Sequence, residues 1–105
     1  MADFTRVAKV SDVEPGQIKR FSVNGEDVAI ANHEGQFYAF SNYCTHQGAD
    51  FAGGFGEVYG NDLVCLLHDS AFSLTTGEPI DGPAFEALPI YAVRVEGDEL
   101  LVGRE

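Results

Sequence analysis

Both cysteines of this 105-residue chain lie within three residues of a histidine. The two pairs are Cys44-Thr45-His46 and Cys65-Leu66-Leu67-His68, and eighteen residues separate His46 from Cys65. Each pair places one thiol and one imidazole on a short segment, so two such segments facing each other supply four ligands for a metal centre. Because the chain has only two cysteines and three histidines, chance would rarely produce two matching pairs. The spacing therefore predicts a metal site that holds two loops together.

The same residue types also suit a disulfide or a zinc ion. A disulfide between Cys44 and Cys65 would account for the cysteines in an exported protein but would leave both histidines without a role. A tetrahedral zinc ion accepts two thiolates and two imidazoles. Structural zinc sites more often use C-x₂₋₄-C and H-x₃₋₅-H units, so the mixed spacing disfavours zinc without excluding it.

The rest of the chain is divided at short intervals by Gly, Asn and Asp into segments that alternate apolar and polar residues or are rich in Val, Ile, Phe and Tyr. This pattern is typical of an all-β protein, and Asn24-Gly25 is its strongest hairpin signal. No window of a dozen residues keeps a helical period, although residues 7–13 allow a short helical turn. Two irregular stretches, 41–56 and 66–84, contain Cys44, His46 and His68, and Cys65 ends the expected strand directly before the second stretch. The expected strands cover residues 17–23, 27–31, 36–40, 57–59, 62–65, 88–95 and 99–102.

Taken in order, these motifs resemble the Rieske [2Fe-2S] family. The resemblance extends to Gly48-Ala49, Phe72, Thr76-Gly77-Glu78-Pro79 and Gly82-Pro83-Ala84, the last matching the proline loop that covers the cluster in that family. It implies one domain over residues 1–105, an antiparallel β-sandwich or barrel, with a small cluster-binding part at about 42–84 and base strands from both ends of the chain.

The resemblance also implies a ligand set for one [2Fe-2S] cluster. By position, Cys44 and Cys65 would bind the inner iron, and His46 and His68 would bind the outer iron near the surface. The serine two residues after the second histidine ligand bonds a bridging sulfide in respiratory members of the family. Here that residue is Ser70, which we therefore expect to contact the cluster.

Several positions separate this chain from the respiratory members. Those proteins join their loops by a disulfide, whereas Ala49 and Leu67 occupy the two cysteine positions here. Phe72 replaces a tyrosine that bonds a cysteine sulfur. Asp69 replaces a common glycine, and its carboxylate either opposes reduction of the nearby cluster or is only a solvated loop charge. We therefore expect a reduction potential near the low end of the Rieske range of about −150 to +300 mV. Leu66 replaces a common proline and would alter only loop rigidity.

The remaining site assignments concern surface and core. We expect the docking surface to comprise Gln47, Gly48, Phe72 and Pro83. Tyr43 and Phe51 are interpreted as ordinary core residues beside the loops, and His33 as a surface histidine.

The formal net charge is −11, from 17 acidic and 6 basic residues, and no basic cluster is present. Nucleic acid is therefore a disfavoured partner. The start of the chain lacks a leader pattern, and no apolar run approaches the roughly 18 residues needed to cross a bilayer. We expect a cytoplasmic monomer with no membrane contact, whose acidic surface either meets a basic partner or only keeps the protein soluble.

The function implied by the resemblance is one-electron transfer. We expect a non-enzymatic ferredoxin that carries electrons from a flavin-dependent NAD(P)H reductase to a terminal Rieske non-haem iron oxygenase, through transient docking at the cluster tip and the acidic surface. The chain is too short to contain the second iron centre of an oxygenase. The alternatives are the small Rieske-like subunit of an NAD(P)H nitrite reductase, which the complete ligand quartet disfavours, and a structural zinc module.

Overall fold

The computed structural model describes residues 4–23, 25–43, 50–66, 70–81 and 87–103. These residues form ten β-strands and two short helical turns. The strands are β1 (Phe4–Lys9), β2 (Ile18–Val23), β3 (Glu26–His33), β4 (Gln36–Ser41), β5 (Gly56–Tyr59), β6 (Asp62–Cys65), β7 (Ser70–Ser73), β8 (Pro79–Asp81), β9 (Ile90–Glu96) and β10 (Glu99–Gly103). A 3₁₀ turn, η1, covers Val10–Asp12, and a π-type turn, η2, covers Phe51–Phe55.

Six strands from both ends of the chain form the base sheet, in the order β1-β10-β9-β4-β3-β2. All neighbours in this sheet are antiparallel. β9 pairs with β10 along most of its length but with β4 only at Ala39–Tyr91 and Phe40–Ile90. The sheet bends strongly at this short junction, and its edge strands β1 and β2 come into contact. The base sheet is therefore nearly closed, as a β-barrel is.

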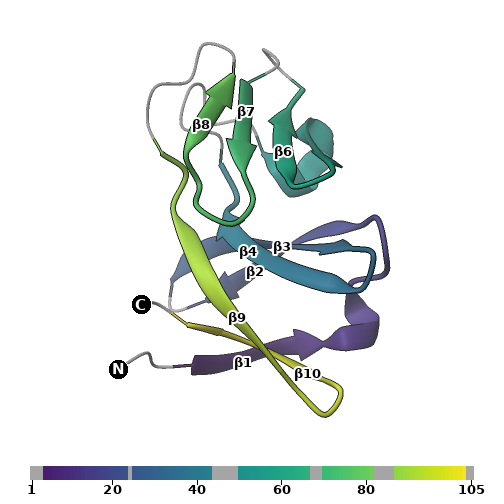
Figure 1. Cartoon of the computed structure of the whole chain (residues 1–105). Coiled ribbons are helices and arrows are strands. Elements are labelled where there is room, and N and C mark those ends of the chain that lie inside the picture. Colours follow the sequence, from purple (N-terminus) through teal and green to yellow (C-terminus); the bar gives the residue numbers. More distant parts are fainter. Residues whose placement is uncertain (1–3, 24, 44–49, 67–69, 82–86, 104–105) are drawn as a thin grey trace.

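The middle of the chain forms a second, four-stranded antiparallel sheet in the order β5-β6-β7-β8. This sheet lies above the base sheet in Figure 1, and the start of β9 leads back down from it. The arrangement confirms the expected all-β fold. The base sheet is formed by strands from both ends of the chain, and the second sheet is formed by strands from its middle.

β3 connects the two hydrophobic cores because it is buried on both faces. Successive side chains of a strand point to opposite faces, so Val28 and Ile30 pack inside the base sheet, whereas Ala29 and Ala31 face the second sheet. The small alanines leave room for larger side chains above them. The core between the sheets contains, besides these alanines, Phe40, Phe51, Leu63, Cys65, Phe72, Leu74 and Leu88.

The return from the second sheet to the base depends on a close backbone contact at Gly77. Its φ of +79° lies in the left-handed region, and its carbonyl accepts a hydrogen bond from the Leu88 amide at 2.7 Å. A Cβ at this position would clash with the Leu88 carbonyl oxygen. Glycine is therefore required sterically as well as conformationally.

Seven expected strands are confirmed with small shifts at their ends, and the hairpin predicted at Asn24-Gly25 is confirmed by the Val23–Glu26 pairing. The expected helical turn corresponds to η1. The sequence interpretation missed β1, and it treated β7 and β8 as irregular. β1 carries a register shift between Arg6 and Ala8 that interrupts its alternation, and the other two strands have only four and three residues. Among the described residues, no helix is long and apolar enough to span a membrane.

Candidate metal centre

Cys65 is the one predicted ligand that lies within the described residues. It ends β6, between Gly56 of β5 and Ser70 of β7 in the sheet, and its exposed fraction is 1%. The next residue donates its backbone N–H to the Phe55 carbonyl at 2.7 Å, which extends the pairing past the end of the strand. Two neighbouring strands therefore fix the backbone of Cys65. Cys44, His46 and His68 lie outside the described residues.

Ser70 is fully buried directly opposite Cys65. Its Oγ has no hydrogen-bond partner among the residues that the structure describes. A buried hydroxyl without a partner loses about 1–3 kcal/mol relative to one that is bonded, so such groups call for an explanation. An anionic sulfur acceptor beside Cys65 would supply the missing partner, and this orphaned donor therefore fits the expected cluster.

The segment that carries Cys44 and His46 is closed at its ends by hydrogen bonds. Tyr43 and Asp50 form an isolated antiparallel bridge. Just outside it, the buried Asn42 donates its side-chain amide to Asp50 Oδ1 at 2.6 Å. The Asn42 side-chain oxygen accepts the Ala52 N–H at 3.0 Å. Sequence reasoning missed both Asn42 and Asp50, although polar residues that form Asx turns on either side of a Cys-x-His segment are a usable signal.

Three phenylalanines form a hydrophobic layer beneath these two regions. Phe51 packs edge-to-face against Phe40 at 5.7 Å and against Phe72 at 6.5 Å between ring centroids. The expectation that Phe51 belongs to the core is confirmed by its 1% exposure. The expectation that Phe72 lies on the docking surface is wrong, because its side chain is fully buried. Ser70 and Phe72 share one face of β7, and that face points inward.

The expectation that Tyr43 belongs to the core is also wrong. Its side chain is 38% exposed, and its hydroxyl donates to Asp27 Oδ2 at 2.6 Å. This hydrogen bond, with smaller contributions from partial desolvation and the Asp27 charge, raises the pKa of Tyr43, while nearby Arg20 opposes the shift. Tyr43 thus ties the start of the first ligand segment to β3.

Two apolar side chains are exposed next to Cys65. Phe55 is 42% exposed and Leu66 is 43% exposed. The other residues expected at the docking surface, Gln47, Gly48 and Pro83, lie outside the described residues, as do Ala49, Leu67 and Asp69. His33 lies at the end of β3 with a partly exposed side chain, 3.8 Å from Glu34 Oε2.

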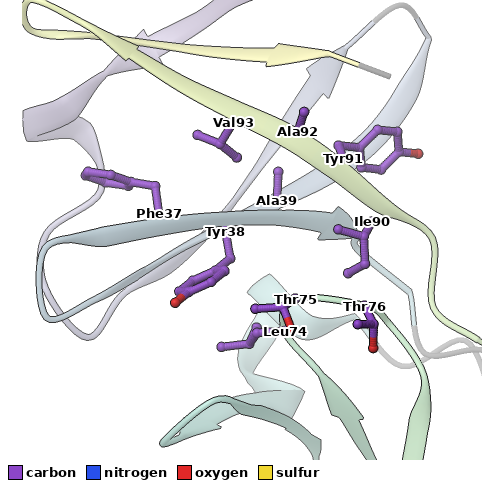
Figure 2. A pocket seen from close by; sticks show the side chains of 10 residues that line it. All are labelled: Phe37, Tyr38, Ala39, Leu74, Thr75, Thr76, Ile90, Tyr91, Ala92 and Val93. Carbon is purple, nitrogen blue, oxygen red and sulfur yellow. The ribbon is translucent and has the colours of Figure 1, made fainter. Parts of the chain in front are cut away.

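A pocket of about 510 Å³ lies elsewhere, between β4, β9 and the turn after β7 (Figure 2). None of its lining residues is a predicted ligand, and Ser70 is not among them. This pocket is therefore separate from the candidate metal centre. Its lining consists of Phe37, Tyr38, Ala39, Leu74, Thr75, Thr76, Ile90, Tyr91, Ala92 and Val93.

Comparison with known protein families decides what kind of centre this is. Residues 3–92 match the family model described as the Rieske [2Fe-2S] domain. The chain belongs to the Rieske [2Fe-2S] family. It is 35% identical over 99 residues to a biphenyl dioxygenase ferredoxin subunit of Pseudomonas sp. strain KKS102, with 94% of this chain and 90% of that protein covered.

Solved Rieske structures agree. The ferredoxin of carbazole 1,9a-dioxygenase from Nocardioides aromaticivorans IC177 superimposes with a TM-score of 0.87 and 31% identity, covering 97% of this chain and 98% of that one. A chain in the complex of reduced oxygenase and oxidised ferredoxin of carbazole 1,9a-dioxygenase matches with a TM-score of 0.84 and 32% identity, covering 97% of this chain and 94% of that one. The Rieske fold is thus confirmed over nearly the whole chain.

Membership of this Rieske family also settles the cofactor and the class of activity. The cofactor is one [2Fe-2S] cluster, so the zinc alternative no longer applies. The similar proteins are ferredoxin components, which makes this chain an electron carrier and not a catalytic enzyme. When bound, the cluster supplies one-electron chemistry. The protein's part is to bind it, and Cys65, Ser70 and the phenylalanine layer are the described residues that fit this task.

Proposed function

We propose that this chain carries single electrons from a flavin-dependent NAD(P)H reductase to a terminal Rieske oxygenase, with the cluster held by Cys44, Cys65, His46 and His68. The observation that carries the proposed ligand set is the pairing of buried Cys65 with Ser70, whose hydroxyl lacks a partner among the described residues. Cys65 supplies a thiolate and Ser70 supplies a hydroxyl donor at paired positions of one hairpin. Such a pair suits a cluster whose sulfurs accept hydrogen bonds.

Histidine ligation suits a carrier of this kind. Two ferric ions, two sulfides, two thiolates and two neutral imidazoles sum to zero charge, so an added electron creates one negative charge. A cluster with four thiolates would have to accept an electron while already negative, which is electrostatically harder. The proposed ligand set would therefore lower the electrostatic cost of reduction in a protein whose formal net charge is −11.

The distribution of charge supports a basic partner surface. Every Lys and Arg of the chain lies before Phe21 or after Val93, whereas the cluster-binding part at 42–84 contains six carboxylates and no basic residue. Arg20 offsets one of these carboxylates, Asp50. The acidic excess that remains would steer the carrier toward basic patches on a reductase and an oxygenase through short-lived contacts. The exposed Phe55 and Leu66 beside Cys65 supply apolar contact area for such docking. We propose that the carrier is a monomer and that it works in the cytoplasm, where a reductase supplies electrons from NAD(P)H.

The first experiment tests the ligand set. The purified protein should show the visible bands of a Rieske cluster and a reduced-state electron-resonance signal, and Cys44→Ser, His46→Asn, Cys65→Ser and His68→Asn should each abolish them. His33→Asn is the matched control, because His33 lies at the β3–β4 turn on the base sheet, and it should retain the full signal. If one of these variants kept an unaltered cluster, the substituted residue would not be a ligand.

The second experiment tests the direction of electron flow. Chemically reduced protein is mixed with an oxidised terminal Rieske oxygenase, and oxidation of the carrier is followed by its absorbance in stopped flow. The proposed function predicts rapid transfer that slows as ionic strength rises, because exposed charges are screened. Transfer to the siroheme subunit of a nitrite reductase, with none to the oxygenase, would instead support the alternative. The relatives named above are components of oxygenase systems and do not favour that alternative.

A further inference from the structure

The two ligand segments of the cluster-binding part are held at their ends in different ways. The segment containing His68 is bounded by Cys65 and Ser70, which belong to a regular β ladder between β6 and β7. The segment containing Cys44 and His46 is bounded by Tyr43 and Asp50, which form only an isolated bridge. No disulfide can join the two segments, because the positions used for it in respiratory relatives are Ala49 and Leu67. Among the described residues, the ends of the first segment therefore have less backbone pairing than the ends of the second.

Asn42 constrains the first segment with both its side chain and its backbone. Its side-chain amide donates to Asp50 Oδ1 at 2.6 Å, and its side-chain oxygen accepts the Ala52 N–H at 3.0 Å. Its backbone carbonyl accepts the Phe51 N–H at 2.9 Å, and its own N–H donates to the Asp27 carbonyl at 3.2 Å. The residue is fully buried. A buried amide that bonds through both its donor and its acceptor fixes a single geometry, because any movement would leave polar groups without partners.

Asp50 completes the arrangement on the other side of the segment. Besides Asn42, its Oδ1 accepts the Gly53 N–H at 2.9 Å, and its Oδ2 lies 3.4 Å from Arg20 Nη1 of β2. A Cβ at Gly53 would lie 2.8 Å from Asp50 Cγ, so the backbone approaches the carboxylate more closely than any other residue would permit. Bonds from a charged acceptor are roughly twice as strong as neutral ones. The carboxylate thus anchors η2 and the end of the first segment together.

We propose that Asn42 and Asp50 act as positioning residues, a polar clamp that holds the Cys44–His46 segment in the shape that binds the cluster. This inference rests on the ligand set proposed above. The clamp takes the place of the interloop disulfide at the segment whose described ends, Tyr43 and Asp50, form only an isolated bridge. Its loss increases the rate at which the cluster escapes and alters the cluster's environment, while the base sheet stays folded.

The test compares two buried asparagines in the cluster-loaded protein. Asn42→Asp keeps the size of the side chain and the oxygen that accepts from Ala52. It removes the N–H that donates to Asp50 and places two carboxylates next to each other. Asn32→Asp is the matched control. Asn32 is 5% exposed, donates its side-chain amide to the Val13 carbonyl at 2.8 Å and accepts the Gly35 N–H at 3.0 Å. It lies five residues along β3 from Asp27, about 17 Å along an extended strand, and both of its side-chain hydrogen bonds go to residues outside the clamp.

Cluster loss is followed by the decay of visible absorbance in excess chelator, well below the unfolding temperature. Asn42→Asp should raise the rate about tenfold to hundredfold, the effect of losing one hydrogen bond to a charged acceptor. Asn32→Asp should change the rate of cluster loss less than twofold. It should lower the unfolding midpoint at least as much as Asn42→Asp does. The double variant Asn42→Asp/Asp50→Asn restores one donor and one carboxylate between the two positions, so it should return the rate to within about fivefold of that of the natural protein. It still lacks the Gly53 bond and the charge opposite Arg20.

Reduction potential and the electron-resonance line shape supply the second readout, since a merely structural role would leave both unchanged. The clamp is refuted if Asn42→Asp and Asn32→Asp lose the cluster at the same rate and keep the same potential, or if the double variant gives no recovery. Should Asn42→Asp not fold, Asp50→Asn takes its place, because it keeps one oxygen that can accept from Asn42 and Gly53 while it removes the negative charge and the acceptor for Arg20. Absence of a Rieske signal in the natural protein would refute the proposed function instead.

Discussion

Replacing Ser70 by alanine should lower the reduction potential of the cluster. The side chain is fully buried, and its Oγ has no partner among the described residues, so the hydroxyl is available to donate to the cluster. Removing the oxygen leaves the backbone pairing between Ser70 and Cys65 intact. The change therefore isolates one hydrogen bond.

The size of the shift follows from the charge that the electron adds. A hydrogen bond contributes about 1 kcal/mol when its acceptor is neutral and about 1.5–3 kcal/mol when the acceptor is charged. The cluster changes from neutral to a single negative charge, so the bond strengthens on reduction by about 0.5–2 kcal/mol, or about 1.2 kcal/mol at the middle of that range. Since about 1.4 kcal/mol corresponds to about 59 mV for one electron, Ser70→Ala should lower the potential by about 50 mV.

Protein-film voltammetry at fixed pH measures the shift directly. Ser73→Ala serves as the control, because Ser73 lies on the same strand but its hydroxyl already bonds Thr75 Oγ1 at 3.0 Å. We expect a change of less than about 10 mV for Ser73→Ala, as its partner is not the cluster. Equal potentials for the natural protein and Ser70→Ala would show that the hydroxyl does not bond the cluster, and the account of this orphaned donor would have to be abandoned.

Three further predictions concern stability. Gly77→Ala should destabilise the protein by about 2–4 kcal/mol in denaturant unfolding, since it adds both left-handed strain and a clash. Gly97 also has a positive φ, +63°, but a Cβ there would meet open space, so Gly97→Ala should lower the free energy of unfolding by only about 1–2 kcal/mol. Equal losses for the two variants would show that the clash at Gly77 contributes nothing. Because its bond to Asp27 raises the pKa of Tyr43, the stability that this bond supplies is present below about pH 10 and lost as pH rises through the raised pKa. Tyr43→Phe should therefore lose less stability than the natural protein in alkaline titration, and parallel curves would refute the coupling. Removing the cluster should lower the unfolding temperature by about 10 °C or more, as expected when a tightly bound group is lost from the native state, and calorimetry that shows no change would exclude this contribution.

The fold was predictable wherever the local pattern and the tertiary structure agree. The alternation around Asn24-Gly25 predicts the β2–β3 hairpin, and the residues around Cys65 predict β6. β7 and β8 could not be predicted in the same way. They are short, and β8 begins with a proline, so these strands exist because they pair with β6 and with each other. The local strand propensity of these residues does not predict such pairing.

The candidate site shows the same division. The Cys-His spacing identifies the kind of centre, because each loop must carry its metal ligands within a few residues of each other. Phe72 was placed wrongly because a position matched to a family says which residue is present but not which face of a strand it occupies. Asn42 was missed because its importance arises from burial and from partners at residues 27 and 50–52, which only the folded chain reveals.

The hairpin that joins Cys65 to Ser70 has a consequence for the speed of electron exchange. Ladder pairing fixes the backbone of both residues, and the buried Leu63 and Phe72 leave their side chains little room to move. The hydroxyl oxygen is therefore held in place before any electron arrives, and the backbone at these two residues has no rearrangement to complete when the charge changes. A carrier built in this way can accept and release an electron within a brief encounter, which suits a protein that must leave one partner to reach the next.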